Sequence, residues 1–155
     1  MKKLILLLLI ITSSCVGPRT INYYNEPNTQ IDFYTSENTK KLDFPFSDAT
    51  IVNNVIYVAG QVGNIPGTNE VVPGGIKEET KQTMKNIEAV LTSLGSSMDK
   101  VFKCTCMLSD ISEWGDMSEE YKKFFKNNKR PSRSAFAGTG LALGAKVEIE
   151  CWAVK

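Results

Sequence analysis

The two side chains best suited to chemistry in this sequence are Arg133 and Glu148. Each lies in a segment expected to form a β-strand, where charged residues are usually scarce. An arginine offers a fixed fork of donors that can grip a carboxylate at two points, and a nearby glutamate can orient or deprotonate a water molecule. Such a pair could hold a small carboxylate beside an activated water molecule. From spacing alone, solvated charges or a structural ion pair are the commoner explanation.

The overall composition narrows the chemistry and the partners. The 155 residues include 18 basic and 17 acidic side chains and no histidine. Without histidine, acid–base work falls to Glu, Asp, Lys, Tyr, Cys or bound water. The net charge is near zero, and the sequence lacks the excess of basic residues that is typical of nucleic-acid-binding proteins. We therefore expect a small molecule as the partner, and no nucleic acid.

Neither the cysteines nor the glycine-rich loop predicts a metal or a cofactor. Cys104 and Cys106 lie two residues apart, but with no histidine and only Cys151 as a further candidate the ligand count of a zinc site is not reached. Buried core thiols are the expectation, and a disulfide between Cys151 and Cys104 or Cys106 is the alternative. The loop at 138–144 lacks the Lys-Ser/Thr of a phosphate loop and the third glycine of a dinucleotide site, which favours a plain turn.

Short segments of alternating or β-branched residues predict six strands. Asn53-Asn54 is expected to form a hairpin turn, because asparagine tolerates positive φ, and Gly60 is expected to end the following strand. One face of the strand after residue 100 is expected to carry Phe102, Cys104, Cys106 and Leu108. The strands are expected at residues 31–34, 47–52, 55–59, 101–108, 133–137 and 146–154.

Two amphipathic helices are predicted between these strands. The first runs from Ile76 to Leu94, where apolar residues recur at steps of three and four, and Gly95 can close it in a left-handed conformation. The second is expected from Ser112 to Lys126, and Pro131 prevents its continuation. Its apolar stripe comprises Trp114, Met117, Tyr121, Phe124 and Phe125.

The order of these elements points to one α+β domain over residues 31–155. A chain of this length supports a single hydrophobic core. In this fold class helices cover one face of a mixed sheet, so we expect a two-layer sandwich with both helices on the same face.

The N-terminus has the anatomy of an export signal. A basic start and an apolar run from Leu4 to Ile11 precede small residues and Cys15, and the run is too short to span a bilayer. Residues 1–14 resemble a bacterial lipoprotein signal peptide, which implies a lipid on Cys15 and a place in the cell envelope. Residues 15–30 are expected to form a flexible tether. Cleavage without lipidation and a cytoplasmic protein are the alternatives.

Over nearly the whole predicted domain, eight short stretches in order resemble the RidA (YjgF) family, the L-PSP endoribonuclease-like proteins. The stretches are Pro45-Phe46-Ser47, Ala59-Gly60-Gln61, Gly74-Gly75-Ile76, Asn86 to Leu91, Gly95-Ser96-Ser97, Tyr121 to Phe125, Arg130 to Ser134, and Val147 to Glu150. The resemblance implies a chorismate-mutase-like fold and homotrimers with ligand clefts between subunits. It also implies hydrolysis of reactive 2-imino acids, and enamines such as 2-aminoacrylate, to 2-keto acids and ammonia.

The same resemblance implies the roles of individual residues. Arg133 would bind the substrate carboxylate, Glu148 would position or activate water, and main-chain groups at Gly60 and Ala135 would line the pocket. Three substrate-binding positions depart from the commonest family pattern. Phe46 and Ser118 stand where tyrosine and asparagine are usual, and Ala135 stands where cysteine is frequent, which excludes thiol chemistry there.

Export would separate this chain from the cytoplasmic PLP enzymes that usually generate 2-aminoacrylate, so the resemblance does not fix its own substrate. One alternative function is a non-catalytic, trimeric small-carboxylate-binding module in the cell envelope. A ribonuclease is a further alternative, since that activity is attributed to some relatives. The near-neutral charge and missing histidine argue against it.

Overall fold

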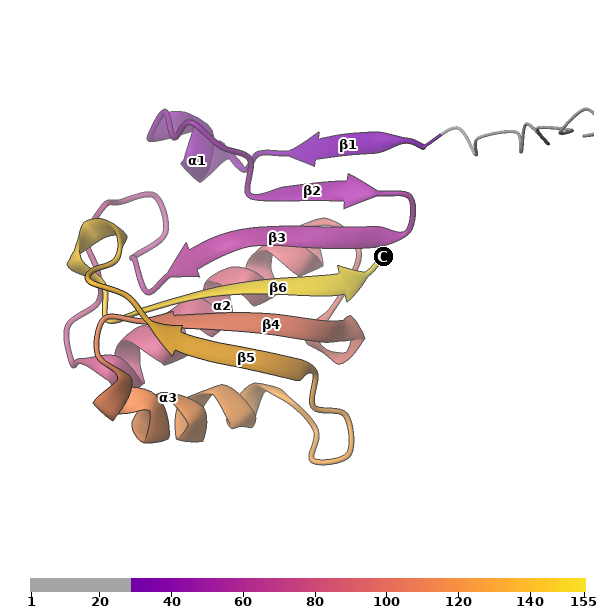
Figure 1. The fold of residues 1–155 in the computed structure, drawn as a ribbon. Helices are drawn as coiled ribbons and strands as arrows, with labels where there is room; N and C mark the ends of the chain where they lie inside the picture. The colour runs from indigo at the N-terminus through magenta and orange to yellow at the C-terminus, as the bar shows by residue number, and fades with distance from the viewer. Residues whose placement is uncertain (1–28) are drawn as a thin grey trace, which may run out of the picture.

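The computed structural model describes residues 29–155, which form one six-stranded sheet and three helices (Figure 1). The predicted signal peptide, Cys15 and nearly all of the predicted tether lie outside the described residues. Within residues 29–155, no helix is long and apolar enough to cross a membrane. The strands and helices are β1 (Ile31–Tyr34), α1 (Glu37–Lys41), β2 (Ala49–Val52), β3 (Val55–Val62), α2 (Ile76–Ser93), β4 (Val101–Leu108), α3 (Trp114–Tyr121), β5 (Ser132–Ala137) and β6 (Val147–Val154).

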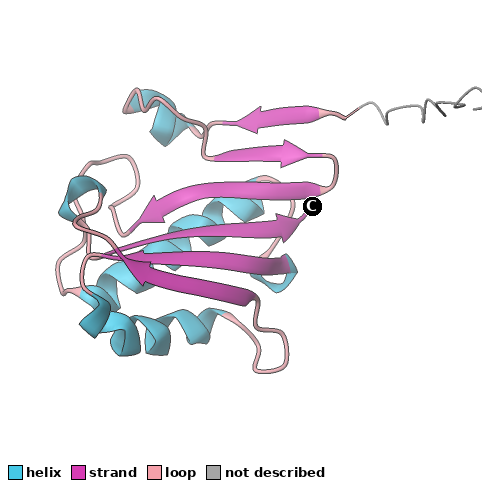
Figure 2. Ribbon diagram, in the orientation of Figure 1, coloured by secondary structure: helices cyan, strands magenta, loops and turns pink. Residues whose placement is uncertain are grey.

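The strands lie in the order β1-β2-β3-β6-β4-β5. All neighbouring pairs are antiparallel except β4 and β5, which are parallel, so the sheet is mixed. Helices α2 and α3 lie against the same face of the sheet (Figure 2). The predicted α+β sandwich, with a mixed sheet and two helices on one face, is therefore confirmed. We call the sheet face away from these helices the open face; it carries Tyr57, Met107, Phe136, Glu148, Glu150 and Trp152.

The core lies between the sheet and α2. Alternate residues of a strand point to opposite faces, so β6 sends Val147, Ile149, Cys151 and Ala153 toward the helices, as predicted. From α2, the residues that meet them include Met84, Ile87 and Leu91, all of them fully buried. This interdigitation removes apolar surface from water and holds β6, with Glu148 on its other face, in one register.

Helix α2 ends where the glycine pattern predicts. Gly75 precedes it with a φ of 74°, and Gly95 follows it with a φ of 75°. Ser96 N–H donates to the Leu91 carbonyl at 2.8 Å, which satisfies a carbonyl of the last turn. The buried Glu79 near the start of the helix accepts from Lys146 N–H at 2.7 Å. This bond ties α2 to the beginning of β6.

Two predictions about the strands are wrong, and a β-bulge explains each. β3 does not end at Gly60 but continues to Val62, because its pairing with β6 resumes after an irregularity between Val58 and Gln61. Phe102 does not share the core face of β4. An irregularity between Val101 and Lys103 reverses its direction, leaving the ring 42% exposed and 6.4 Å from that of Trp152.

The helices also differ from prediction in two places. The second predicted helix is shorter: α3 covers Trp114–Tyr121 and is flanked by 3-10 turns at Ile111–Glu113 and Lys122–Phe124. The short α1 was not predicted, since five residues are too few for a periodic apolar pattern. It begins at Ser36, whose hydroxyl accepts from Thr39 N–H at 3.3 Å.

Candidate functional site

Arg133 projects from the edge strand β5 toward α3 and is held there by four side chains, among them Met117, whose sulfur accepts from Nη1 at 3.8 Å. Its Nη2 donates to Ser118 Oγ at 3.0 Å. The guanidinium carbon lies 5.3 Å from the ring centroid of Trp114 and 4.9 Å from that of Tyr121. None of the ion pairs in the described part of the chain includes Arg133. The structure therefore positions a cation without a carboxylate partner.

A hollow of about 330 Å³ surrounds this guanidinium, and we call it the Arg133 hollow. Two other cations line it but have contacts of their own. Lys122 is paired with Glu119 at 2.5 Å, and Arg130 donates to Asn127 Oδ1 at 2.8 Å. The hollow is thus suited to an anion of modest size, with Arg133 as a cation that has no carboxylate partner among the described residues. Its lining residues are Trp114, Gly115, Ser118, Glu119, Tyr121, Lys122, Arg130, Pro131 and Arg133.

Glu148 lies on the open face of β6 and lines a second depression of about 440 Å³, the Glu148 cleft. Gly60 and Phe46 line the same cleft. A Cβ atom added to Gly60 would overlap Oε1 of Glu148, so the carboxylate occupies space that only a glycine leaves free. The resemblance to the family placed Gly60 at the site, and the structure gives a steric reason for a glycine there.

The electrostatics of Glu148 suit a base. Burial raises the pKa of its carboxyl above the ordinary value, and the neighbouring charge of Glu150 raises it further. No hydrogen bond or salt bridge involves its carboxylate among residues 29–155. A half-buried carboxylate with a raised pKa and free oxygens can accept a proton from water more readily than an exposed one.

Within one chain, Arg133 and Glu148 do not share a pocket. Arg133 is paired with Cys104 on β4, and Cys104 with Cys151 on β6, so the two charged residues are two strands apart, about 10 Å across the sheet. Their side chains also point to opposite faces, Arg133 toward α3 and Glu148 away from the helices. The two residues therefore line separate depressions of one chain.

The other predicted site residues divide between these two depressions. Phe46 and Gly60 belong to the Glu148 cleft, and Ser118 belongs to the Arg133 hollow. Ser118 reaches Arg133 although it is shorter than the asparagine usual in the family. Ala135 is half-buried against the core and its side chain lines neither depression.

The sequence interpretation missed the role of the aromatic residues around Arg133. It assigned Trp114 and Tyr121 to one apolar stripe. Tyr121 is indeed buried in the core, but Trp114 is 46% exposed, and both rings also face the guanidinium. The spacing could have revealed this role, because residues at steps of four and three, such as Trp114, Ser118 and Tyr121, lie on one face of a helix. A face combining two rings and a hydroxyl is suited to holding a cation.

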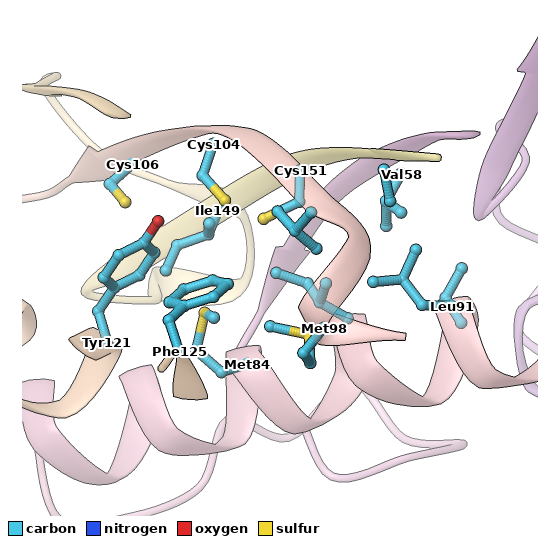
Figure 3. Close-up of a cluster of buried hydrophobic side chains, with 14 of the residues drawn as sticks. Val58, Met84, Leu91, Met98, Cys104, Cys106, Tyr121, Phe125, Ile149 and Cys151 are labelled. Atoms are coloured by element: carbon cyan, nitrogen blue, oxygen red, sulfur yellow. The ribbon is translucent and has the colours of Figure 1, made fainter. Parts of the chain in front are cut away.

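The three cysteines among the described residues lie in the core beside the sheet, as predicted. Cys104, Cys106 and Cys151 are buried and unpaired, and Figure 3 shows Tyr121 with its hydroxyl directed toward the first two. Burial raises the pKa of the Cys106 thiol to about 12, so that thiol stays protonated and unreactive near neutral pH. These sulfur atoms fill the layer beneath β4 and β6.

Comparison with known proteins agrees with the resemblance seen in the sequence. The family model described as endoribonuclease L-PSP matches residues 39–155. The chain is 40% identical over 110 residues to the 2-iminobutanoate/2-iminopropanoate deaminase of Rattus norvegicus, covering 71% of this chain and 80% of that protein. It is 38% identical over 111 residues to the human protein of the same name, covering 72% and 80% respectively.

Solved structures share the fold. A protein of the conserved Rid family from Yersinia pestis superposes with a TM-score of 0.75 at 32% identity, covering 81% of this chain and 100% of that one. The E. coli protein TdcF, solved with bound serine, has a TM-score of 0.66 at 25% identity and covers 72% of this chain and 89% of its own. Sequence and fold lead to one conclusion: this chain belongs to the endoribonuclease L-PSP family, also called the RidA or YjgF family.

Proposed function

We propose that this protein hydrolyses reactive 2-imino acids, and their enamine tautomers, to 2-keto acids and ammonia. The observation that carries the proposal is Arg133, a guanidinium held by Ser118 and two aromatic rings with no carboxylate partner among residues 29–155. Glu148, unpaired and with a raised pKa, supplies the matching base. The names of the mammalian relatives and the serine bound to TdcF support a small 2-amino or 2-imino carboxylate as the ligand.

The active unit is a homotrimer whose sites lie between subunits. Among the described residues, no lysine or arginine lines the Glu148 cleft, and in the trimer a neighbouring chain supplies the cation that binds the carboxylate. The open face and its rim also expose Phe102, Phe136, Trp152 and Val154, an apolar surface that a second copy would cover. A closed ring sets the Arg133 hollow of each subunit against the Glu148 cleft of the next.

In such a site the reaction needs the protein's own side chains and water. Arg133 holds the substrate carboxylate at two points and thereby fixes the position of the imine carbon. Glu148 takes a proton from water as the water oxygen bonds to the carbon of the protonated imine. The protonated Glu148 then returns the proton to the amino nitrogen of the tetrahedral intermediate. The carbon–nitrogen bond breaks as the carboxylate of Glu148 accepts the hydroxyl proton, so the 2-keto acid forms, and ammonia leaves with that proton as ammonium.

The direct test follows release of 2-keto acid from imines that an amino-acid oxidase generates in situ. The purified protein should accelerate the release, and Arg133→Ala should abolish the acceleration. Lys85→Ala, an exposed position on α2, is the matched control and should behave as wild type. A wild-type protein indistinguishable from buffer contradicts the proposal. Saturable binding of a keto acid without turnover would identify a binding module instead.

A mixing experiment tests whether the site is shared between subunits. Arg133→Ala and Glu148→Gln are each expected to be inactive alone. When the two variants are denatured and refolded together, about a quarter of the interfaces combine an intact Arg133 with an intact Glu148, and that share of the activity should return. If the mixture stays inactive while each variant forms trimers in sedimentation, the site does not lie between subunits.

We also propose that the domain works in the cell envelope, held to a membrane by a lipid on Cys15. The proposal rests on the order of basic start, apolar run, small residues and cysteine at the N-terminus. Mass spectrometry of the N-terminal peptide from native membranes should find Cys15 as the first residue, carrying a diacylglycerol. An intact Met1 in the native protein would contradict it.

A further inference from the structure

Leu143 has an unusual backbone at the edge of the Glu148 cleft. It lies in the 3-10 turn Ala142–Gly144 with φ 58° and ψ 15°, in the left-handed region. The other described non-glycine residues with positive φ are Asp43 and Asn53, types that tolerate this conformation. Leucine does not favour it, and its side chain is nevertheless 44% exposed. The turn thus holds a large apolar side chain at the surface, in a strained conformation, where folding does not require it.

The side chain of Leu143 is one of several apolar groups that line the cleft containing Glu148. Phe46 lines it as well, and its ring is stacked on that of Phe44, with 5.2 Å between centroids and 18° between planes. Phe46 is 49% exposed, which leaves its surface free for a ligand. The cleft therefore offers an apolar wall beside the proposed base.

Within the Glu148 cleft itself, the described residues offer no free charge to pair with a charged substrate side chain. Its ionisable carboxylates are Asp48 and Glu148. Asp48 is buried, and its oxygens accept from Ser36 N–H at 2.6 Å and Thr39 Oγ at 2.7 Å. Glu148 is already assigned to taking the proton from water. At about 440 Å³, the cleft falls in the range of roughly 300–1,000 Å³ typical of sites for ligands far larger than a three-carbon imine.

On the basis of the function proposed above, we propose that the preferred substrates are 2-imino acids with a large apolar side chain, branched-aliphatic, thioether or aromatic, and that Leu143 is a specificity-determining residue. The substrate side chain packs against Leu143 and Phe46 while its carboxylate is bound by Arg133 of a neighbouring subunit. Because each additional buried methylene improves discrimination about tenfold or more, kcat/KM should rise by at least that factor from the alanine-derived to the leucine-derived imine.

The experiment compares kcat/KM for imines derived from alanine, leucine, phenylalanine and glutamate, using wild type, Leu143→Asn and Leu143→Met. Asparagine tolerates the left-handed backbone and has a similar size but is polar, so the leucine-to-alanine ratio should fall by roughly tenfold. Methionine keeps an apolar side chain and should retain most of the ratio. Thermal melting checks that both variants fold.

A measurement on the wild-type protein alone keeps the inference testable even if the Leu143 variants fail to fold. The branched keto acid derived from leucine should inhibit at a concentration at least tenfold lower than pyruvate does. Turnover of the alanine-derived imine with no preference for leucine, or a preference for glutamate, would overturn this inference and leave the deaminase function standing. Absence of turnover with every imine would overturn the proposed function itself.

Discussion

The Arg133 hollow and the Glu148 cleft are built in opposite ways. The side chains that hold Arg133 all belong to α3, within twenty residues of it in the chain, and each contact is attractive: hydrogen bonds to Ser118 and to the Met117 sulfur, and two ring contacts. Glu148 has no such contact among the described residues. Its place depends on the space that Gly60 leaves, in a cleft whose lining extends from Tyr34 to Glu148.

From this difference we infer that the Arg133 hollow binds the substrate and that the Glu148 cleft carries out the chemistry. A guanidinium held on several sides loses little freedom when it binds a carboxylate, which suits a clamp. A carboxylate without partners keeps its proton affinity and its mobility, which suits a base that first takes a proton and later returns it. Changes to the two regions should therefore affect different kinetic constants.

Apart from Arg133→Ala, which should abolish activity, the largest expected effect comes from Glu148→Gln. The amide keeps the shape of the side chain but cannot accept a proton from water, so kcat should fall by about 10²- to 10⁴-fold while KM changes little. Steady-state kinetics on an oxidase-generated imine measures both constants. A rise in KM at constant kcat would mean that Glu148 binds substrate and that the division between the two regions is wrong.

The next-largest effect on kcat is expected for Gly60→Ala. The new Cβ would overlap Oε1 of Glu148, and since φ of Gly60 is not in the left-handed region, the flexible carboxylate moves and the backbone does not. We expect kcat to fall by about tenfold to a hundredfold, as a displacement near 1 Å can do, with melting temperature nearly unchanged. In a Glu148→Gln background the same substitution should have little further effect. Additive losses in the double variant would indicate a separate role for Gly60.

A smaller effect is expected at Trp114, a positioning residue for Arg133. Trp114→Ala removes one of the two rings that face the guanidinium, a contact worth about 0.5–1 kcal/mol at an exposed site, so KM should rise about two- to fivefold. The value of kcat should stay near wild type. Trp114→Phe should restore most of the binding because it retains a ring. Equal losses in the alanine and phenylalanine variants would rule out a ring contact as the cause.

The smallest expected effect is a shift of the pH profile in Glu150→Gln. The negative charge of Glu150 helps to raise the pKa of Glu148, so its removal lowers that pKa. A general base must be deprotonated to act, so activity falls as pH drops through the pKa of Glu148. The acidic limb of the kcat profile should therefore move to lower pH in the variant. A limb that does not move, or moves to higher pH, would show that Glu148 is not the titrating group.

Local patterns in the sequence predicted most of the elements. Apolar residues at every third or fourth position before Gly95 predicted α2. The alternation of residues along β6 predicted that Ile149 and Cys151 lie on one face, which is the core face. These patterns work because helix and strand periodicities are set by neighbouring residues. They failed at Gly60, where the strand resumes pairing after a bulge, and at Phe102, which a bulge turns to the open face, because a bulge depends on the partner strand.

By itself the sequence determined the fold class, the family and the two residues, Arg133 and Glu148, on which the proposed chemistry rests. Only the tertiary structure decided that these residues point to opposite faces of one sheet, that Trp114 and Tyr121 hold Arg133, and that Leu143 lines the cleft of Glu148. Residue type and spacing are local properties of the chain. Which face a strand turns toward the helices, and which distant loop lies beside it, depends on contacts between segments far apart in sequence.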